Sequence, residues 1–565
     1  MLIGKNASGG IAYGPAMVLK PIIIKIENEP ATDVDFECQR FQHTLVAAKA
    51  DINKLYEKVK TSVGEEEAQI FEAHSMLLDD PELIDTVESF IRTNRWKASK
   101  AIDEAAKQFI KMFESMDNAY MRERALDIKD VTERLLKKVL GLNFQDLSNL
   151  ESDVILVAHD ITPSQFASLE HAKVKAIVTE IGGKTSHTAI MARTLEIPAV
   201  VGMKEATLKI KNGENIIVDG DTGHIETKPN AQSLKEYEAK KIVLKEVKEA
   251  LEKIKNVPVQ TKDGFSLHLE ANITSAADVP AALKNQAQGV GLFRTEFIFM
   301  DRSSAPTEDE QTEIYKTVLE KMEGRPTVIR TLDIGGDKNL PYLGIPKEEN
   351  PFLGYRAVRY CLNNIPLFKT QLRALLKAST AGKLGIMFPM ITNLEEIIAC
   401  RKLLEECRTE LVNEKVTVAQ DIRIGIMIEV PAAALIADLL AKHVDFFSIG
   451  TNDLTQYVCA VDRMNENVHD LYDSYHPGFL RLTKFVIESA NKAGIEICMC
   501  GEVASDPKLT EVLVGMGLTH FSMNPASILK IKDRILKINK NEAKIKAEKV
   551  VTLSTGDEIR NFLNS

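Results

Sequence analysis

An alternation of short apolar runs with longer helix-like segments fills the chain beyond about Lys262 and constrains its fold more than any other feature. Such alternation is typical of α/β domains with a parallel sheet. We expect eight strands, near residues 267–273, 289–293, 327–332, 384–389, 424–428, 446–449, 495–499 and 520–523. Eight parallel strands separated by helices predict a (β/α)8 barrel, or TIM barrel, over residues 262–565.

Polar residues follow several of these runs, at the point where each predicted strand ends. They lie in the segments Arg294-Thr295-Glu296, Arg330-Thr331-Leu332-Asp333, Glu429-Val430-Pro431, Gly450-Thr451-Asn452-Asp453 and Cys500-Gly501-Glu502. In a TIM barrel the carboxyl ends of the strands carry the active site. A single arginine at a strand end is more often a salt-bridge partner, but several suitable residues on neighbouring strands predict a functional site.

The arginines and acids of this region suit an anionic ligand and a metal ion. Arg294, Arg330 and Arg463 offer guanidinium groups, which bind phosphate and carboxylate through paired hydrogen bonds. Glu429 and Asp453 supply two hard oxygen ligands, which is enough for Mg²⁺ when substrate and water fill its other positions. The sequence therefore predicts an anion site with a divalent cation at one end of the barrel.

A second motif precedes the barrel. Residues 182–193 read Gly-Gly-Lys-Thr-Ser-His-Thr-Ala-Ile-Met-Ala-Arg, which places His187 just after a tight turn, where we expect a helix to begin. The unpaired N–H groups and partial positive charge of a helix start would favour a phosphoryl group on this imidazole. A first-turn histidine can also be a surface or packing residue, but strand-like runs at 154–158, 176–179, 199–202 and 216–218 favour the catalytic interpretation. Thr162 and Thr185 either orient the imidazole or cap local turns.

Sequence patterns divide the region before the barrel into a helical segment, an α/β domain and a linker. A strand-like segment at 11–19 opens it, and residues 31–143 show helical periodicity with few glycines or prolines, which predicts an inserted helical bundle. Residues 1–30 and 144–228 are expected to form the α/β domain that carries the histidine motif. Residues 229–261 are highly charged, with Leu244, Val247, Leu251 and Ile254 at three- and four-residue spacing. This pattern predicts a solvated linker helix, and a short coiled-coil seam is the alternative.

Composition narrows the classes of partner. The 565-residue chain has a formal net charge of −10 and a pI near 5.7, which argues against a nucleic-acid backbone as the principal ligand. No uninterrupted apolar stretch is long enough to span a bilayer and no signal-like segment opens the chain, so we expect a cytoplasmic protein without membrane insertion. Seven scattered cysteines do not form a disulfide framework, and reduced thiols are expected.

The segment 182–193 closely resembles the phosphohistidine motif of phosphoenolpyruvate (PEP)-utilising enzymes, and the whole chain is similar to the Enzyme I proteins of the bacterial phosphotransferase system. The resemblance implies that the phosphoryl group of PEP passes to His187 and then to a histidine of the phosphocarrier protein HPr, with release of pyruvate, in the first step of sugar uptake. It implies Mg²⁺ as cofactor, HPr docking on residues 31–143, and a homodimer formed through the barrel. Because the histidine and the barrel lie in separate domains, it also implies a swivelling domain.

The resemblance assigns roles residue by residue. His187 and Cys500 are catalytic, Glu429 and Asp453 hold the metal, and the substrate ligands are Arg294, Arg330, Asn452, Asp453 and Arg463. In this family the cysteine matching Cys500 gives a proton to carbon 3 of enolpyruvate, as a thiol at a strand end can do. Cys498 lies two residues earlier, so both thiols could face one side of the strand. We expect Cys498 to pack, because no further cluster of Cys or His is adjacent to complete a zinc site.

Three alternative functions were weighed. Pyruvate phosphate dikinase and PEP synthase share both motifs but carry a large ATP-binding domain, for which we expect no room in this chain. The nitrogen-related Enzyme I paralogue carries an N-terminal sensory domain, which we expect to be absent because the chain starts directly at Met1-Leu2-Ile3-Gly4. A non-catalytic docking protein on the same scaffold would have lost His187 or the barrel acids, and none is lost.

Overall fold

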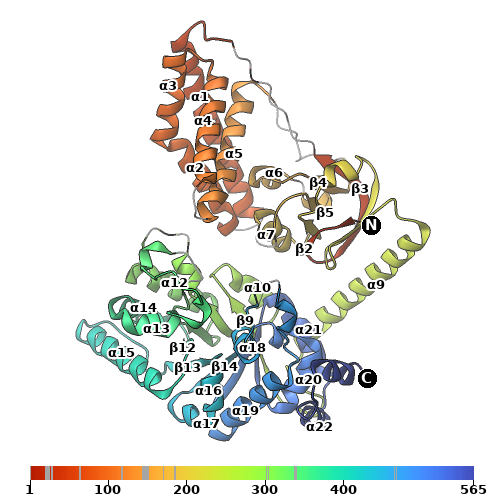
Figure 1. Ribbon diagram of the computed structural model, residues 1–565, viewed down its shortest axis with the longest axis vertical. Coiled ribbons are helices and arrows are strands. Elements are labelled where there is room, and N and C mark those ends of the chain that lie inside the picture. Colours follow the sequence, from red (N-terminus) through yellow and green to blue (C-terminus); the bar gives the residue numbers. More distant parts are fainter. Residues whose placement is uncertain are drawn as a thin grey trace. The chain divides into compact units, whose positions relative to one another are not determined.

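The computed structural model describes residues 2–565 except 20–25, 27–28, 63–64, 116–118, 143–149, 151, 170, 184–185, 301, 303, 336–339, 464 and 466. The chain divides into two compact units, Met1–Lys248 and Glu249–Ser565, which we call unit 1 and unit 2 (Figure 1). Among the described residues, no helix has both the length and the apolar character needed to cross a membrane. All seven cysteines are free thiols.

Unit 1 contains an eight-stranded mixed sheet with the order β1-β8-β7-β3-β4-β5-β6-β2. Its strands are β1 Leu2–Ile3, β2 Lys5–Ser8, β3 Ile11–Leu19, β4 Val154–Ala158, β5 Val174–Thr179, β6 Ala199–Val201, β7 Asn215–Asp219 and β8 His224–Thr227. The central strands β3, β4, β5 and β6 run parallel, whereas β7 pairs antiparallel with β3. Three short helices, α6 Pro163–Ser168, α7 His187–Thr194 and α8 Ala206–Lys209, connect the strands. The strands predicted at 11–19 and 154–158 are confirmed with the same bounds.

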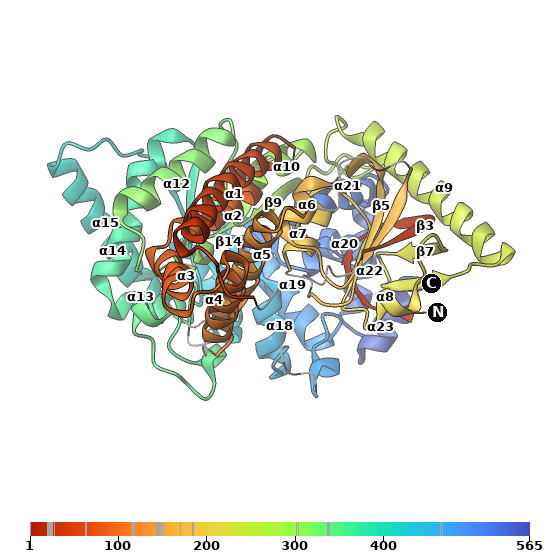
Figure 2. The ribbon, with the colours of Figure 1, turned by 90° about the horizontal axis from the view of Figure 1, so that it is seen from above.

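In the described part of the chain, five helices lie between β3 and β4 and pack around their own core. They are α1 Val34–Ser62, α2 Glu65–Asp79, α3 Pro81–Asn94, α4 Ala98–Glu114 and α5 Ala119–Val139. Their long axes run side by side in Figures 1 and 2, as in a helical bundle. Asp80 separates α2 from α3 because its side chain accepts a hydrogen bond from the Glu82 N–H and Pro81 occupies the first helical position.

A single helix, α9 Ala231–Ile254, follows β8 and contains the boundary between the two units. Tyr237 is its one buried side chain, and Leu244 and Val247 are exposed. The helix is therefore solvated along most of its length.

Unit 2 is a closed barrel of eight parallel strands, as the sequence predicts. The strands are β9 His268–Ile273, β10 Val290–Arg294, β11 Thr327–Arg330, β12 Leu384–Phe388, β13 Arg423–Ile428, β14 Phe446–Gly450, β15 Glu496–Cys500 and β16 His520–Met523. Each lies within two residues of its predicted position. The barrel closes where β16 and β10 both pair with β9.

Helices surround the barrel and bury the outward-facing side of each strand in one large apolar core. They are α10 Asp278–Lys284, α11 Glu296–Phe299, α12 Glu308–Lys321, α13 Ala357–Asn363, α14 Ile365–Ala378, α15 Leu394–Asn413, α16 Pro431–Leu435, α17 Ala437–Leu440, α18 Thr451–Cys459, α19 Pro477–Ala493, α20 Pro507–Met516, α21 Ile528–Leu536, α22 Lys540–Val550 and α23 Gly556–Asn564. Outward residues such as Ile426, Phe447 and Met499 belong to this core. Their sequence neighbours point into the barrel, because side chains alternate along a strand.

Candidate active site

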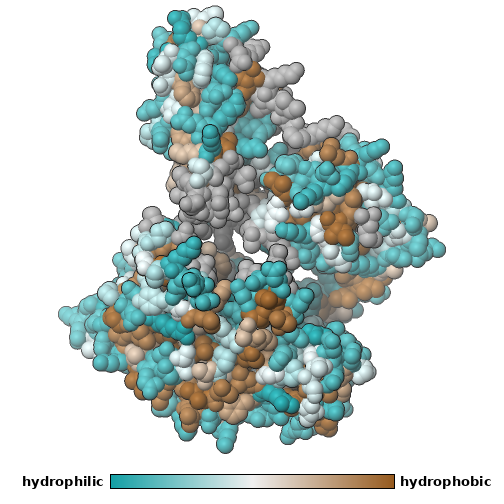
Figure 3. Space-filling view, in the orientation of Figure 1, coloured by the Kyte–Doolittle hydropathy of each residue, from teal (hydrophilic) through white to brown (hydrophobic). Residues whose placement is uncertain are grey.

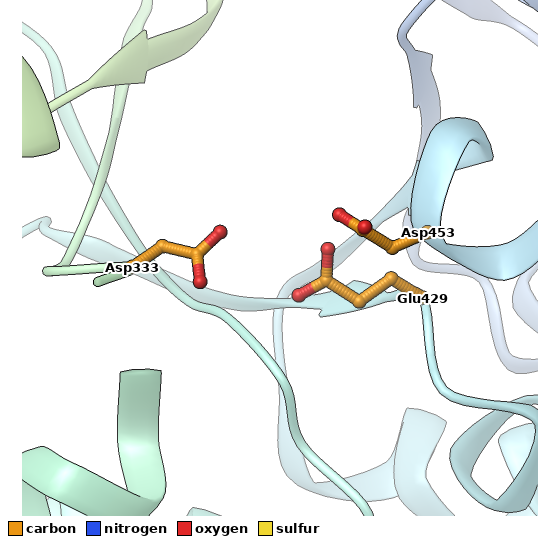
Figure 4. A group of neighbouring side chains, drawn as sticks. All are labelled: Asp333, Glu429 and Asp453. Atoms are coloured by element: carbon orange, nitrogen blue, oxygen red, sulfur yellow. The ribbon is translucent and has the colours of Figure 1, made fainter. Parts of the chain in front are cut away.

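Three carboxylates meet at the carboxyl ends of the barrel strands. Asp333 follows β11, Glu429 follows β13, and Asp453 lies in the first turn of α18 after β14. One oxygen of each lies within 4.8 Å of the others, and Figure 4 shows the three groups directed toward one another. Asp333 and Glu429 are 4% and 1% exposed. Three acids gathered in a buried site repel one another unless a cation or basic groups balance them.

Two of these carboxylates have an oxygen that no donor satisfies. The Met390 N–H donates to Glu429 Oε1 at 2.6 Å, but Glu429 Oε2 has no hydrogen-bond partner in the described part of the chain. The same holds for Asp453 Oδ1, although Arg463 Nη1 lies 3.4 Å away without hydrogen-bond geometry. Unsatisfied buried oxygens of this kind fit a hard divalent cation.

The protonation of Glu429 agrees with a cation site. The pKa of Glu429 is raised to about 8, chiefly by burial and also by the negative charges of Asp333 and Asp453, while Arg330 and the Met390 N–H oppose the rise. A bound divalent cation would reverse this shift, because it favours the ionised carboxylate.

Arg330 stands at the end of β11 among acidic neighbours. Its Nη2 donates to Glu296 Oε1 at 2.8 Å, and its Nη1 lies 2.8 Å from Asp333 Oδ2. Burial disfavours its charge, yet the negative charges of Asp333 and Glu296 raise the pKa of Arg330 above its ordinary value. Its Nε has no hydrogen-bond partner among the described residues.

Arg356 is a second buried guanidinium at this face. Its Nη2 donates to Asp333 Oδ1 at 2.9 Å, so that Asp333 holds one arginine with each oxygen. Only 5% of the residue is exposed, and within the described ranges its Nε and Nη1 have no hydrogen-bond partner. Buried donors without partners are costly, so this pair of arginines is suited to an anion.

The remaining candidate ligands lie on the same face. Arg294 is the last residue of β10 and is half-buried. Asn452, in the first turn of α18, accepts a hydrogen bond from the Glu502 N–H at 3.3 Å. A side chain at Gly501 would lie within 3.0 Å of Asn452 Oδ1, and the φ of +110° at this residue favours glycine.

Cys500 ends β15 inside the barrel and is 2% exposed. Ser448 Oγ donates to its sulfur at 3.3 Å. Burial raises the pKa of Cys500, although the Ser448 hydrogen bond and Arg330 oppose this effect. The sulfur is therefore a protonated thiol at neutral pH, which is the form required of a proton donor.

The histidine motif lies in unit 1, away from these residues in the chain. His187 is the first residue of α7, and Ser186 caps the helix by accepting a hydrogen bond from the Ala189 N–H at 3.4 Å. The helix thus begins where the sequence predicts. The His187 imidazole and all of Thr185 lie outside the described residues. Thr162 forms a capping box at the start of α6, as one of the two interpretations of this residue expects.

Three polar residues of the barrel face were not singled out from the sequence. Asp333 and Glu296 stand in the strand-end segments named above, so their position was a usable signal. Arg356 lies 26 positions after Arg330, the last residue of β11, and its sequence position gives no strand-end signal. The long connection that follows β11 in the sequence is the one indication, because such connections carry active-site residues in a TIM barrel.

Family models match most of the chain. A model described as "PEP-utilising enzyme, PEP-binding domain" matches residues 248–540, and models described as "PEP-utilising enzyme, N-terminal" and "PEP-utilising enzyme, mobile domain" match residues 3–124 and 150–223. The first of these spans the barrel, and the third contains the histidine motif.

Full-length relatives carry one name. The chain is 48% identical over 562 residues to a protein of Bacillus subtilis named phosphoenolpyruvate-protein phosphotransferase, covering 100% of this chain and 99% of the relative. A protein of the same name from Geobacillus stearothermophilus is 48% identical over 560 residues, which cover 99% of this chain and 97% of the relative. Among solved structures, a solution structure of an Enzyme I protein is 40% identical, with a TM-score of 0.39, and matches 43% of this chain and 100% of its own.

Proposed function

The chain belongs to the family of PEP-utilising enzymes, and we propose that it is a phosphotransferase that carries the phosphoryl group of PEP through a phosphohistidine at His187 to a histidine of the phosphocarrier protein HPr, releasing pyruvate. Full-length relatives named phosphoenolpyruvate-protein phosphotransferase support this reaction. The observation that carries the proposal is the pairing, at one end of the barrel, of buried guanidinium donors and buried carboxylate oxygens that have no hydrogen-bond partner among the described residues.

In the proposed substrate complex, the arginines receive the two negative groups of PEP. Asp333 holds Arg330 and Arg356, and each arginine keeps at least one N–H group without a hydrogen-bond partner among the described residues. Arg294, Arg463 and Asn452 complete the set as further ligands of phosphate and carboxylate. Guanidinium forks suit both groups, and their fixed positions stabilise the charge that spreads over the transferring oxygens.

Enzymes of this family use a divalent metal, and Mg²⁺ is the ion we propose here. Glu429 and Asp453 would hold it, because each presents a buried oxygen without a hydrogen-bond partner in the described chain. An all-oxygen site with two protein carboxylates is typical of Mg²⁺ that also binds substrate phosphate. When bound, the ion neutralises charge on the phosphoryl oxygens.

Cys500 is proposed to protonate the product. Loss of the phosphoryl group leaves enolpyruvate, which becomes pyruvate when carbon 3 gains a proton. The buried, protonated Cys500 thiol ends β15, next to the strand end that carries Asn452, and its raised pKa keeps the thiol protonated.

The remaining partners follow from the division of the chain. We propose that residues 1–30 and 144–228 form the phosphohistidine domain, that residues 31–143 dock HPr, and that residues 229–261 link them to the barrel of residues 262–565. Because His187 and the barrel ligands lie in different units, the phosphohistidine domain must swivel between its two partners.

We also propose a homodimer formed through the barrel. Leu435, Leu439 and Phe485 are exposed on α16, α17 and α19, which contact one another. Figure 3 shows brown, apolar residues over the region where Figure 1 draws these helices. Exposed apolar groups on adjacent helices favour burial against a second copy. Sedimentation of Leu439→Asp tests this, and an unchanged dimer would argue against the surface.

The decisive experiment is incubation with labelled PEP and Mg²⁺, followed by acid and alkali treatment of the protein. We expect stoichiometric label that is lost in acid and retained in alkali, as for a phosphohistidine. His187→Ala should remove the label while circular dichroism remains that of the wild type. Label retained by this variant would refute the assignment of the nucleophile.

A further inference from the structure

The interior of the barrel is apolar on one side and polar on the other. Val328, Met387, Met427 and Phe446, on β11 to β14, form an apolar cluster that reaches Cys500. The opposite side carries inward-facing polar groups on β9, β14, β15 and β16, namely Glu270, Asn272, Ser448, Cys498 and Ser522. TIM-barrel interiors are usually filled by branched apolar residues, so a polar half needs a reason.

Three of these buried side chains form a chain of contacts that starts at Cys500. Ser448 Oγ donates to Cys500 Sγ at 3.3 Å, and Ser448 lies opposite Cys498 on the neighbouring strand β15 and lowers the pKa of its thiol. Cys498 Sγ in turn donates to Glu270 Oε2 at 3.7 Å. All four residues are at most 6% exposed. Every member carries a proton that can move along such a chain.

The chain of contacts leads toward the amino-terminal face of the barrel. There Glu496 lies two residues before Cys498 on β15, so both side chains are on the inward side of the strand. The charge of Glu496 also acts on Glu270. Glu496 Oε2 lies 3.5 Å from His520 Nε2, and the rings of His520 and His268 stack with centroids 4.4 Å apart. His268 is exposed. Titratable groups therefore connect the surroundings of Glu270 with solvent at the end of the barrel opposite Asp333 and Glu429.

Glu270 is held in a protonated state and in a tight space. The pKa of Glu270 is raised to about 8, chiefly by burial and also by the charge of Glu496, while Arg423 and the Cys498 hydrogen bond oppose the rise. A Cβ atom at Gly291 would lie 2.5 Å from Glu270 Oε2 and 2.5 Å from Ser522 Oγ, so glycine is required beside the carboxyl group. A buried acid is costly to keep, and no part of the proposed phosphoryl transfer uses it.

We propose that Glu270, Cys498 and Ser448 form a proton relay that returns a proton to Cys500 from the amino-terminal face of the barrel. This inference rests on the proposed function. After each phosphoryl transfer, the S–H bond of Cys500 breaks as a C–H bond forms at carbon 3 of enolpyruvate. The Cys500 thiolate then takes the Ser448 hydroxyl proton, Ser448 takes the Cys498 proton, and Cys498 takes the Glu270 proton.

One solvent proton then restores the Glu270 carboxyl group through the face that carries Glu496 and His520. In total, one proton enters from solvent for each pyruvate that is formed, and no group is oxidised or reduced. The role of Cys498 changes accordingly, from the packing expected from the sequence to a relay between Ser448 and Glu270. The relay would supply protons to Cys500, which solvent cannot reach directly because Cys500 is 2% exposed and substrate occupies the opposite face.

Two isotope exchanges in the full-length protein test the relay. With Mg²⁺, PEP and pyruvate present, exchange of carbon label between pyruvate and PEP reports the complete reaction in both directions. Loss of tritium from the pyruvate methyl group to solvent reports whether the proton taken by Cys500 escapes before it returns. We expect the ratio of tritium loss to carbon exchange to fall by roughly 10- to 100-fold in Glu270→Gln and Cys498→Ala.

Matched variants separate the relay from damage to the barrel. Cys498→Ser keeps a hydroxyl at the same position and should restore the ratio, and Cys407→Ala, a buried thiol on α15, should leave it unchanged. A wild-type ratio in both Glu270→Gln and Cys498→Ala would overturn the relay. Absence of carbon exchange in the wild type would instead contradict the proposed function, so the two failures are distinguishable.

Discussion

The two roles available to the barrel carboxylates can be separated by a pair of substitutions. Both oxygens of Asp333 are occupied by guanidinium groups, from Arg330 at 2.8 Å and Arg356 at 2.9 Å. Within the described part of the chain, the carboxylate oxygens without a hydrogen-bond partner belong instead to Glu429 and Asp453. We therefore expect Asp333 to position the arginines and Glu429 to bind the metal, although one oxygen of each of the three carboxylates lies within 4.8 Å of the others.

Asp333→Asn should destabilise unit 2 and leave its response to metal intact. Asparagine keeps one acceptor but turns an N–H donor toward the other guanidinium, and loss of one partner of a buried ion pair costs about 3–5 kcal/mol. Mg²⁺ at 100 times its dissociation constant adds about 2.7 kcal/mol of stability. The variant should keep this increment, because Glu429 Oε2 and Asp453 Oδ1 are unchanged.

Glu429→Gln should show the opposite pattern. Because the pKa of Glu429 is raised to about 8, the metal-free protein holds it as a neutral acid at pH 7, and glutamine replaces it with little loss of stability. The glutamine carbonyl can still accept the Met390 N–H. The Mg²⁺-dependent increment should disappear, since an amide is a poor substitute for an anionic ligand.

Denaturant unfolding of the full chain, with Mg²⁺ and with a chelator, measures both quantities. Glu296→Gln is the matched control, because it removes the other buried partner of Arg330 without touching the three-carboxylate group. It should lose stability and keep the metal increment. Loss of the increment in Asp333→Asn, or its retention in Glu429→Gln, would refute this division of roles.

Three further predictions concern other parts of the molecule. Cys500→Ala should slow pyruvate formation far more than it weakens PEP or Mg²⁺ binding, as measured by pyruvate release and by titration; equal losses would contradict a proton-donor role. A fragment ending near Val257 should exchange phosphoryl groups with phosphorylated HPr but gain none from PEP, and label from PEP would show that the substrate site is misplaced. The raised pKa of Glu270 stabilises the fold below pH 4.5, and this contribution is lost as the pH rises through about 8. Glu270→Gln should therefore gain stability relative to the wild type between pH 5 and pH 9 in thermal unfolding, and a constant difference would argue against the shift.

The barrel was predictable because each of its strands appears in the sequence as a separate apolar run. Eight apolar runs separated by helix-like segments leave few other folds, and the parallel order follows once helices separate the strands. The strand-end rule then placed Arg330, Glu429, Asp453 and Cys500 on one face without any knowledge of side-chain contacts. The helix start at His187 was equally local, since a glycine turn and a serine cap specify it.

The ion pairs among these residues were not predictable, because they depend on three-dimensional distances. Nothing in the sequence indicates that Asp333 holds two arginines, or that one of them, Arg356, precedes helix α13. The alternation of polar and apolar residues in β9 is a second feature whose meaning depends on the three-dimensional fold. His268, Glu270 and Asn272 alternate with apolar residues, a pattern that in an antiparallel sheet indicates a solvent-exposed face. In a barrel the apolar residues pack outward against helices, so the polar ones point into the interior.

The inward position of these polar residues connects the fold to the two chemical steps, phosphoryl transfer and protonation of enolpyruvate. Phosphoryl transfer benefits from a site without water, where arginines and a metal act in a low dielectric, whereas protonation of enolpyruvate consumes a proton at every turnover. A barrel has two ends, and its interior can join them without opening the substrate face. With Glu270, Cys498 and Ser448 inside, the proposed relay would supply protons from one end while the other remains closed around PEP. The polar half of the interior then has a function that the apolar half, from Val328 to Phe446, could not provide.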